Sequence, residues 1–324
     1  MKKKRLVTLL CALSLGATMT ACSVDSSTSF TFRWNPNSNN KVIPLDGKEF
    51  YEQYQYSVEL KHESGSNSDY SVNYRNGRYT VTLKADPNDS GYILESSLTI
   101  SVQYTYDGHV SEEFQDSVQS IVKFKGESTL RPTYSEKTVK TTSPISLTAN
   151  SLKDCYRSFH YKTTTTYNSK CTSGVFTQED LGEKTVKDMT KKFSISSKRS
   201  YLDNEQLLFA LRGISGSDQE SISIFDGGSK KTRTVNITQD KKAADSFSFF
   251  FNGADRQSYA IDYTPFNVSF SGDNPGATQK VWIAKYKEEL NNKYRNMILR
   301  METPLSFNLG TLVYKLEKAT TFQA

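Results

Sequence analysis

Alternation of apolar and polar residues with a period of two is the feature that most constrains the fold of this 324-residue chain. Such alternation places every second side chain on one face of an extended strand, so it indicates strands with one buried and one solvated face. It is clear over residues 54–60, 98–106 and 118–124. The chain also holds 19 Tyr and 18 Phe, and aromatic residues pack well on pleated surfaces. A mainly β fold is therefore predicted.

Turn residues between these segments predict hairpins. Asn76-Gly77 lies between two alternating segments, and both residues accept the positive φ of a type I′ turn. Asp107-Gly108 follows a further predicted strand, and residues 226–229 (Asp-Gly-Gly-Ser) are expected to form a hairpin loop. The strongest of these turn signals is Asn76-Gly77.

Two antiparallel β-sandwich-like domains, with at most one or two short helices, are expected from the spacing of the strands. The first occupies 28–142 and the second, β-rich domain occupies 146–324, with Ser143-Pro144 as the linker. Strands are predicted in the second domain over 193–196, 206–211, 221–225, 232–238, 246–251, 267–270, 297–301 and 311–317.

Helical signals are few. Thr177 with an acidic residue three positions later has the pattern of a helix start, although Gly182 restricts this element to a short helix or turn. Apolar residues at helical spacing predict a helix over 284–296.

The start of the chain departs from this β pattern. Four basic residues, Lys2 to Arg5, precede an apolar run over 6–17, and small residues come after it. These are the three parts of a secretory signal. The run is too short to cross a hydrocarbon core of about 30 Å as a permanent helix.

The residues Met19-Thr20-Ala21-Cys22 resemble the lipobox of bacterial lipoproteins, in which a small residue precedes an acylated Cys. The resemblance covers about the first 23 residues. It implies a signal peptide over 1–21, a diacylglycerol on Cys22 and a tether over 22–29. An ordinary cleaved signal is the alternative.

A lipid on Cys22 implies a place for the protein, because two acyl chains together give stable anchoring. The protein is expected on the extracytoplasmic side, attached to the membrane through Cys22. In a host with two membranes, Ser23 after the Cys favours the outer membrane.

Charge argues against a nucleic-acid partner. Four of the 41 Lys and Arg residues belong to the signal segment, which leaves 37 against 35 Asp and Glu. The rest of the sequence contains no basic stripe interleaved with aromatic residues, so nucleic-acid binding is not expected.

Cys155 and Cys171 are the two cysteines beyond the signal segment and Cys22. In an exported domain such a pair permits a disulfide, which by loop-closure entropy would stabilise the fold by about 3 kcal/mol. Two free thiols are the alternative. A metal site is not predicted here, because four ligands are usual and only His160 lies nearby.

One stretch is similar to the front of a calcium loop. Asp86, Asn88 and Ser90 place oxygen ligands at alternate positions, and Gly91 comes next. The last ligand position holds Ser97 instead of a bidentate Glu, and flanking helices are not predicted. A plain turn is the preferred interpretation, and no metal or other cofactor is expected.

Catalytic signals are weak. The three His residues, His62, His109 and His160, form no metal-binding pair. Asp203 and Glu205 could supply two carboxylates for glycoside hydrolysis, but acidic pairs in turns are common and their adjacency gives no separation across a sugar ring. An enzyme is not predicted.

The sequence therefore predicts a lipid-anchored surface protein that acts as a non-catalytic binding or structural module. Its partner would be a protein or a glycan, because the tyrosine ring is apolar while its hydroxyl stays wet. A surface hydrolase or a solute-capture lipoprotein is the alternative. A hydrolase would show a deep pocket with convergent carboxylates or a His partner.

Overall fold

The structure is a computed structural model that describes residues 51–62, 70–89, 91–125, 130–146, 151–182, 184–195, 201–213, 219–227, 231–241, 243–271, 278–284 and 296–322. Several sequence predictions lie outside these residues. They are the signal peptide 1–21, Cys22, the tether 22–29 and, apart from its two end residues, the helix over 284–296.

The strands of the described residues belong to one sheet. Its spatial order is β10-β11-β13-β14-β15-β16-β1-β2-β3-β5-β6-β7-β8-β9, with β12 paired to β13 and β16, and β4 paired to β3. The bounds are β1 Tyr51–Lys61, β2 Tyr70–Ala85, β3 Gly91–Tyr106, β4 His109–Val110, β5 Phe114–Lys125, β6 Pro132–Pro144, β7 Tyr156–Tyr167, β8 Ser173–Asp180, β9 Met189–Ser194, β10 Gln219–Asp226, β11 Lys231–Gln239, β12 Ala243–Phe251, β13 Gln257–Phe270, β14 Gln279–Ala284, β15 Ile298–Pro304 and β16 Thr311–Phe322.

Helical segments are short in this part of the chain. They are the α-helix α1 (Leu207–Leu211) and the 3₁₀ turns η1 (Leu152–Asp154), η2 (Asn204–Gln206) and η3 (Ser306–Asn308).

The mainly β prediction is confirmed, but the two sandwiches are not. Strand β1, from the first predicted domain, pairs along its length with β16, from the second. Strands β6 and β7 also pair across the predicted linker, where Pro144 lies opposite Tyr156. Alternation identifies a strand and its buried face, but it does not identify the strand that pairs with it, so the partition into domains could not be read from it.

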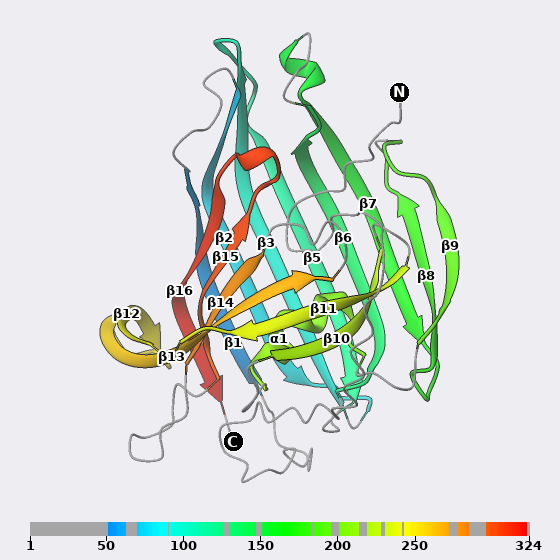
Figure 1. Ribbon diagram of the computed structural model, residues 1–324, viewed down its shortest axis with the longest axis vertical. Helices are drawn as coiled ribbons and strands as arrows, with labels where there is room; N and C mark the ends of the chain where they lie inside the picture. Colours follow the sequence, from blue (N-terminus) through cyan, green and yellow to red (C-terminus); the bar gives the residue numbers. More distant parts are fainter. Residues whose placement is uncertain are drawn as a thin grey trace.

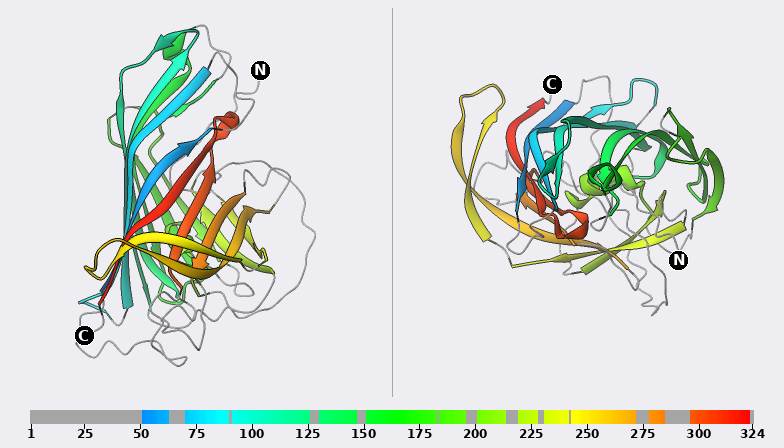
Figure 2. Two further views of the ribbon diagram at one scale, coloured as in Figure 1. Left: turned by 90° about the vertical axis from the view of Figure 1, so that its left-hand side faces the viewer. Right: turned by 90° about the horizontal axis from the view of Figure 1, so that it is seen from above.

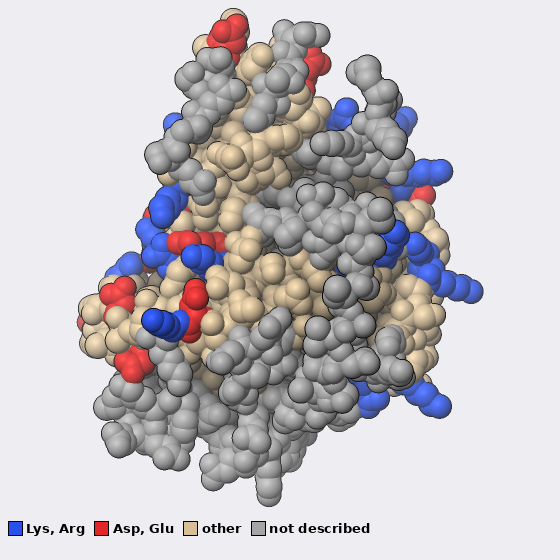
Figure 3. All heavy atoms as spheres, in the orientation of Figure 1, with Lys and Arg blue, Asp and Glu red and all other residues tan. Residues whose placement is uncertain are grey.

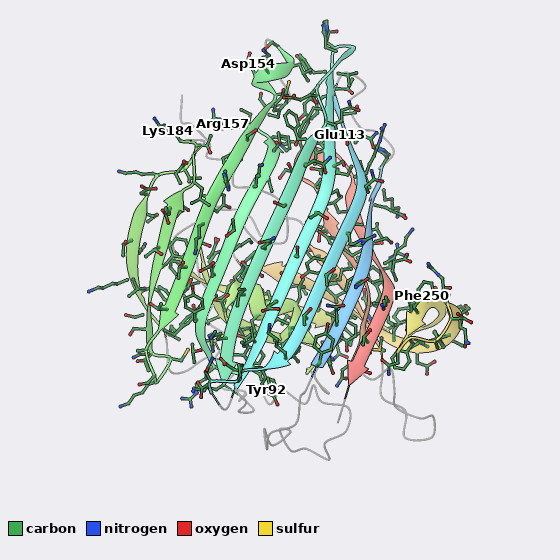
Figure 4. All side chains as sticks on the ribbon, turned by 180° about the vertical axis from the view of Figure 1, so that it is seen from behind. Tyr92, Glu113, Asp154, Arg157, Lys184 and Phe250 are labelled. Carbon is green, nitrogen blue, oxygen red and sulfur yellow. The ribbon has the colours of Figure 1, made fainter. Side chains whose placement is uncertain are left out.

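The sheet is rolled around α1. The long strands β1, β2, β3, β5, β6 and β7 form one wall, and the strands β10, β11, β13 and β14 cross in front of them (Figure 1). Seen from above, the sheet curls round and α1 lies inside the curl (Figure 2). The strand alternation matches this shape: Tyr54, Tyr56 and Val58 of β1 are buried, whereas the intervening residues are half-buried. Polar side chains project from the outer face of the long strands (Figure 4).

Asn76-Gly77 does not form the predicted hairpin, because β2 continues through it. The pairing of β2 with β3 shifts between Arg75 and Arg78, so the two residues form a β-bulge, with Asn76 at φ 54°. A β-carbon on Gly77 would lie 2.4 Å from the carbonyl oxygen of Val58. The Asn-Gly sequence accepts a positive φ and allows a neighbouring backbone to approach closely. A β-bulge requires these properties just as a tight turn does.

The tight turn occurs instead at Asp107-Gly108. Both residues have positive φ, 48° and 73°, as a type I′ turn requires. Tyr106 pairs with His109 across it. Strands β10 and β11 pair antiparallel on either side of the predicted loop at 226–229, with Asp226, the last residue of β10, opposite Lys231; residues 228 and 229 lie outside the described residues.

Two predicted elements differ in type. Residues 206–211, predicted as a strand, form the end of η2 and the helix α1. A short apolar run is compatible with a buried strand or a buried helix, and here the capping box of Asp203 and Gln206 starts a helix. The opposite error occurs at Thr177, which lies within strand β8.

The two ends of the rolled sheet meet through aromatic side chains. Phe193 of β9 stacks on Phe225 of β10 with ring centroids 4.2 Å apart, and Phe176 of β8 lies 5.2 Å from Phe225. Between these ends, Tyr201 forms an isolated parallel bridge with Ser223 of β10. A seam of packed rings therefore joins β9 to β10.

Lysine and arginine side chains project along the side of the molecule where β8 and β9 lie (Figure 3). Lys192 on the edge strand β9 is exposed, and Lys184 in the preceding loop is exposed as well. Charged side chains on an edge strand discourage pairing with another chain. This positive surface is thus accounted for by protection of the sheet edge.

Candidate functional site

A pocket lies inside the rolled sheet, between the long strands, α1 and the strands β14 to β16. Its cavity volume is about 60 Å³, and the empty space within its outline rises to about 880 Å³ when open solvent is included. Aromatic and aliphatic side chains make up most of its lining. The lining residues are Tyr54, Tyr56, Tyr79, Val81, Leu94, Ser96, Asn204, Glu205, Leu208, Phe209, Arg212, Gln279, Ile298, Met301, Thr303 and Tyr314.

Tyrosines from neighbouring strands form one wall of the pocket. Tyr79 of β2 contacts two other rings: Tyr56 of β1, at a ring-centroid distance of 5.9 Å, and Tyr314 of β16, at 5.6 Å. The Tyr56 hydroxyl donates to the carbonyl oxygen of Ile298 at 2.9 Å. Burial raises the pKa of Tyr56, so its phenol stays protonated at neutral pH. Packing and this hydrogen bond hold the rings in fixed orientations.

The opposite wall is α1, and its position depends on the residue before it. The Asp203 carboxylate caps η2 by accepting the Glu205 backbone N–H at 2.9 Å. The same carboxylate accepts the Ser135 hydroxyl at 2.6 Å and the Tyr167 hydroxyl, which attaches the cap to β6 and β7. Burial raises the pKa of Asp203, and the hydrogen bonds from Ser135 and Tyr167 oppose that shift.

A buried ion pair fixes the far end of α1. Nη2 of Arg212 lies 2.8 Å from Oε2 of Glu52 on β1, and both side chains are less than 5 % exposed, at 4 % and 3 %. Arg212 Nε also donates to the carbonyl oxygen of Asn296 at 2.7 Å. Burial lowers the pKa of Arg212, but the Glu52 carboxylate and the neighbouring tyrosines more than offset it, so the net pKa is raised and the guanidinium stays charged.

A second charge pair lies beside the helix start. Nζ of Lys137 on β6 lies 3.1 Å from Oε1 of Glu205, with the two side chains 9 % and 12 % exposed. The Asn204 side-chain amide donates to the same Glu205 oxygen at 2.9 Å. The charged groups that line the pocket, Arg212 and Glu205, therefore both have a partner of opposite charge.

Part of the apolar lining is left incompletely covered. Val81 on β2 and Leu208 on α1 are half-buried although they face the inside of the rolled sheet. Their neighbours Tyr79 and Phe209 are buried. Apolar surface inside the fold therefore remains available for contact with another molecule.

The two carboxylates considered for glycoside hydrolysis belong to residues two positions apart with different surroundings, and the Glu205 backbone N–H donates to the Asp203 carboxylate at 2.9 Å. Asp203 is buried in the cap of η2, whereas Glu205 lines the pocket and pairs with Lys137. Each carboxylate accepts hydrogen bonds from neighbouring side chains.

The histidines lie away from this pocket. His62 comes directly after β1 and is exposed, His109 is exposed in β4, and His160 is half-buried in β7. None of the three belongs to the lining.

The calcium-loop-like residues form a turn. Oδ1 of Asp86 accepts the Asn88 backbone N–H at 3.0 Å, and Oδ2 lies 3.5 Å from Nζ of Lys123. Ser90 lies outside the described residues. Within the described ranges, no group of three or more His, Cys, Asp or Glu side chains is placed to hold a metal ion.

The disulfide predicted between Cys155 and Cys171 is not formed, and both thiols are free and buried. The physical reason is their position at opposite ends of β7, a strand of 12 residues. At about 3.3 Å per residue this strand spans roughly 36 Å, whereas a disulfide requires Cα atoms within about 7 Å. The alternative of two free thiols describes the structure.

Sequence reasoning missed the pocket residues themselves. The alternation predicted that Tyr54 and Tyr56 share a buried face of one strand, but not that Tyr79 and Tyr314 join them. Arg212 had no local signal beyond its place after an apolar run. The site is assembled from strands at both ends of the chain, so only the pairing of β1 with β16 brings it together.

None of the helices that the structure describes is long and apolar enough to cross a membrane. The sequence matches no protein-family model and no curated protein.

Two solved structures align with most of the chain. A β-barrel-like protein of a domain of unknown function from Brucella abortus aligns over 85 % of this chain and 99 % of its own, with 11 % identity and a TM-score of 0.49. A candidate lipoprotein from Parabacteroides distasonis aligns over 90 % and 100 %, with 10 % identity and a TM-score of 0.22. At these scores neither likeness assigns a function to this chain.

Proposed function

We propose that this protein is a lipid-anchored, extracytoplasmic binding protein that holds a small apolar or amphipathic molecule in the tyrosine-lined pocket. The observation that carries the proposal is the incompletely covered apolar surface inside the fold, at Val81 and Leu208. Protein interiors are otherwise packed as densely as organic crystals. A concave, mostly apolar pocket with a few polar groups is the usual form of a small-molecule site.

Binding without chemistry suits this lining better than hydrolysis. Glycoside hydrolysis needs two carboxyl groups on either side of the bond that breaks. Among the described lining residues Glu205 is the one carboxylate, and it is engaged by Lys137 and Asn204. The sequence also allows a glycan, but the half-buried apolar side chains Val81 and Leu208 favour a ligand with an apolar body.

The anchor part of the proposal rests on the signal segment and on Cys22. Residues 23–50 connect Cys22 with β1, the first described strand, so the rolled sheet would be held near the membrane. Two acyl chains on one Cys suffice for stable attachment.

Intact mass and detergent phase partitioning test the anchor. The wild-type protein, expressed in a bacterial host, is expected to begin at Cys22, to carry the mass of a diacylglycerol and to enter the detergent phase. The variant Cys22→Ala is expected to lack the mass of the diacylglycerol and to be absent from the acylated protein that enters the detergent phase. Release of unmodified wild-type protein into the aqueous phase would contradict the anchor.

A pocket-filling variant tests the binding site. The full chain carrying Cys22→Ala, which has no acylation site, is titrated with N-phenyl-1-naphthylamine, an uncharged dye whose emission rises in apolar sites. Val81→Trp is expected to weaken dye binding by about tenfold or more, because the indole occupies the pocket. Thr80→Trp, one residue along β2 and on its outer face, is the matched control and should bind like the parent. Equal binding by the two variants would contradict the proposed site.

A further inference from the structure

The charges around the pocket are already balanced. Arg212 is neutralised by Glu52 at 2.8 Å, and Glu205 is neutralised by Lys137 at 3.1 Å. These four side chains are between 3 % and 12 % exposed, so water does little to screen a further charge beside them. The pocket therefore presents no unbalanced charge to a ligand.

A charged ligand would lose its hydration on entry without gaining a counter-ion. Transfer of an ionised carboxylate or ammonium group into an apolar site is far more costly than transfer of a hydroxyl or amide. A ligand carboxylate could pair with Arg212 or Lys137 only by displacing Glu52 or Glu205, which would leave that carboxylate buried without its partner.

Uncharged polar groups also line the pocket. Ser96 on β3 and Thr303 on β15 are half-buried, and Gln279 lies buried at the start of β14. The Ser96 hydroxyl shares a hydrogen bond of 2.8 Å with the Ser120 hydroxyl and keeps capacity for a second one. Hydroxyl and amide side chains can both donate and accept hydrogen bonds, so they suit a neutral polar end group. The apolar body of such a ligand would lie against Val81, Leu208 and Met301.

We infer that the pocket selects an uncharged amphiphile, with an apolar body such as an acyl chain and a hydroxyl- or amide-bearing end, over a carboxylate or an amine with the same body. This inference rests on the proposed function, and it specifies the class of ligand. The selection comes from the side-chain ion pairs, which reject added charge of either sign.

The test compares three ligands with the same 14-carbon chain: monomyristoylglycerol, myristate and tetradecylamine. Each displaces N-phenyl-1-naphthylamine from the full chain carrying Cys22→Ala, below its micelle concentration, at pH 8. Monomyristoylglycerol is expected to bind at least about tenfold more tightly than either charged ligand. Equal or tighter binding of myristate or tetradecylamine would overturn the inference while leaving the proposed pocket in place. Failure of the dye and of all three ligands to bind would overturn the proposed function, and the inference with it.

A charge variant tests the cause of the selectivity. Glu205→Gln keeps the shape of the side chain and removes the carboxylate that faces Lys137, so the ratio of myristate to monomyristoylglycerol affinity is expected to rise by about tenfold. Glu302→Gln is the matched control, because Glu302 pairs with Arg300 and alternates with the pocket residues Met301 and Thr303 along β15. An unchanged ratio in a folded Glu205→Gln variant would overturn the role given to the ion pairs.

Discussion

Arg212, directly after the helix α1, and Glu52, on the strand β1, form an ion pair of 2.8 Å in the interior of the protein. The pair joins the end of the helix to a strand that precedes it by more than 150 residues. A hydrogen bond from Arg212 to the Tyr54 hydroxyl, at 3.3 Å, joins the same two elements. Because Tyr54 and Arg212 both line the pocket, this contact sets the distance between its two walls.

Removal of one partner of this pair should destabilise the fold strongly. Glu52→Gln is expected to lower the free energy of unfolding by about 3–5 kcal/mol, because it leaves the Arg212 guanidinium buried without its counter-ion. The measurement is urea unfolding monitored by circular dichroism. Glu59→Gln is the control on the same strand, since the Glu59–Lys315 pair is exposed and should contribute about 1 kcal/mol or less. Equal losses for the two variants would contradict the account of the buried pair.

Asp116 on β5 should make stability depend on pH. Burial raises the pKa of this carboxyl from 3.8 to about 8, although Oδ1 accepts the Thr142 backbone N–H at 2.8 Å. Because the pKa is higher in the folded state, folding takes up a proton between about pH 4 and pH 8. The free energy of unfolding contributed by this group therefore falls as the pH rises through that window and is constant above it.

Asp116→Asn is expected to remove this dependence and to raise the free energy of unfolding at pH 8 by about 2 kcal/mol or more. Urea unfolding of the variant and the wild type at pH 5, 6, 7 and 8 measures both effects. If the two proteins lose stability in parallel as the pH rises, Asp116 is not the group responsible.

The bulge in β2 should be sensitive to substitution at one of its residues and tolerant at the other. Gly77→Ala is expected to cost about 1–3 kcal/mol, because the added β-carbon would lie 2.4 Å from the Val58 carbonyl oxygen and the strands would have to separate. Asn76→Gly should change stability by less than about 1 kcal/mol, since glycine adopts a positive φ freely. Thermal unfolding measures the stability of the Gly77→Ala and Asn76→Gly variants relative to the wild type. A Gly77→Ala variant as stable as wild type would refute the close approach of β1 and β2.

The two buried thiols should remain reduced and protected. Cys155 is 0 % exposed and Cys171 is 8 % exposed. Burial raises the pKa of Cys171 to about 11, with the nearby Arg131 opposing the shift, so little thiolate is present at neutral pH. Iodoacetamide is expected to label the peptides that carry Cys155 and Cys171 only after denaturation, with or without a reductant. A disulfide-linked pair of peptides from the unreduced protein would show that the fold around β7 is wrong.

The sequence predicts the strands of this fold better than it predicts their arrangement. Alternation over 54–60 identifies β1 and its buried face, because the period of two is a local property of the backbone. The pairing of β1 with β16 depends on contacts between residues far apart in the chain, for which alternation carries no information. Asn76-Gly77 shows the same limit, since one dipeptide satisfies both a turn and a bulge.

Part of the site has a local signal in the sequence. Asp203 and Gln206 have the spacing of a capping box, which favours a helix at 207–211 over the strand that the apolar run alone suggests. The pocket itself could not be predicted, because it depends on how far α1 stands from Val81 of β2.

The position of a bound ligand tests the central claim most directly. A photoreactive monoacylglycerol is cross-linked to the full chain carrying Cys22→Ala, and the labelled peptides are mapped by mass spectrometry. Labelling is expected in β1, β2, α1 and β15, and an excess of monomyristoylglycerol should suppress it. Labelling that persists under competition, or that centres on the exposed Phe250 of β12 (Figure 4), would contradict binding inside the rolled sheet.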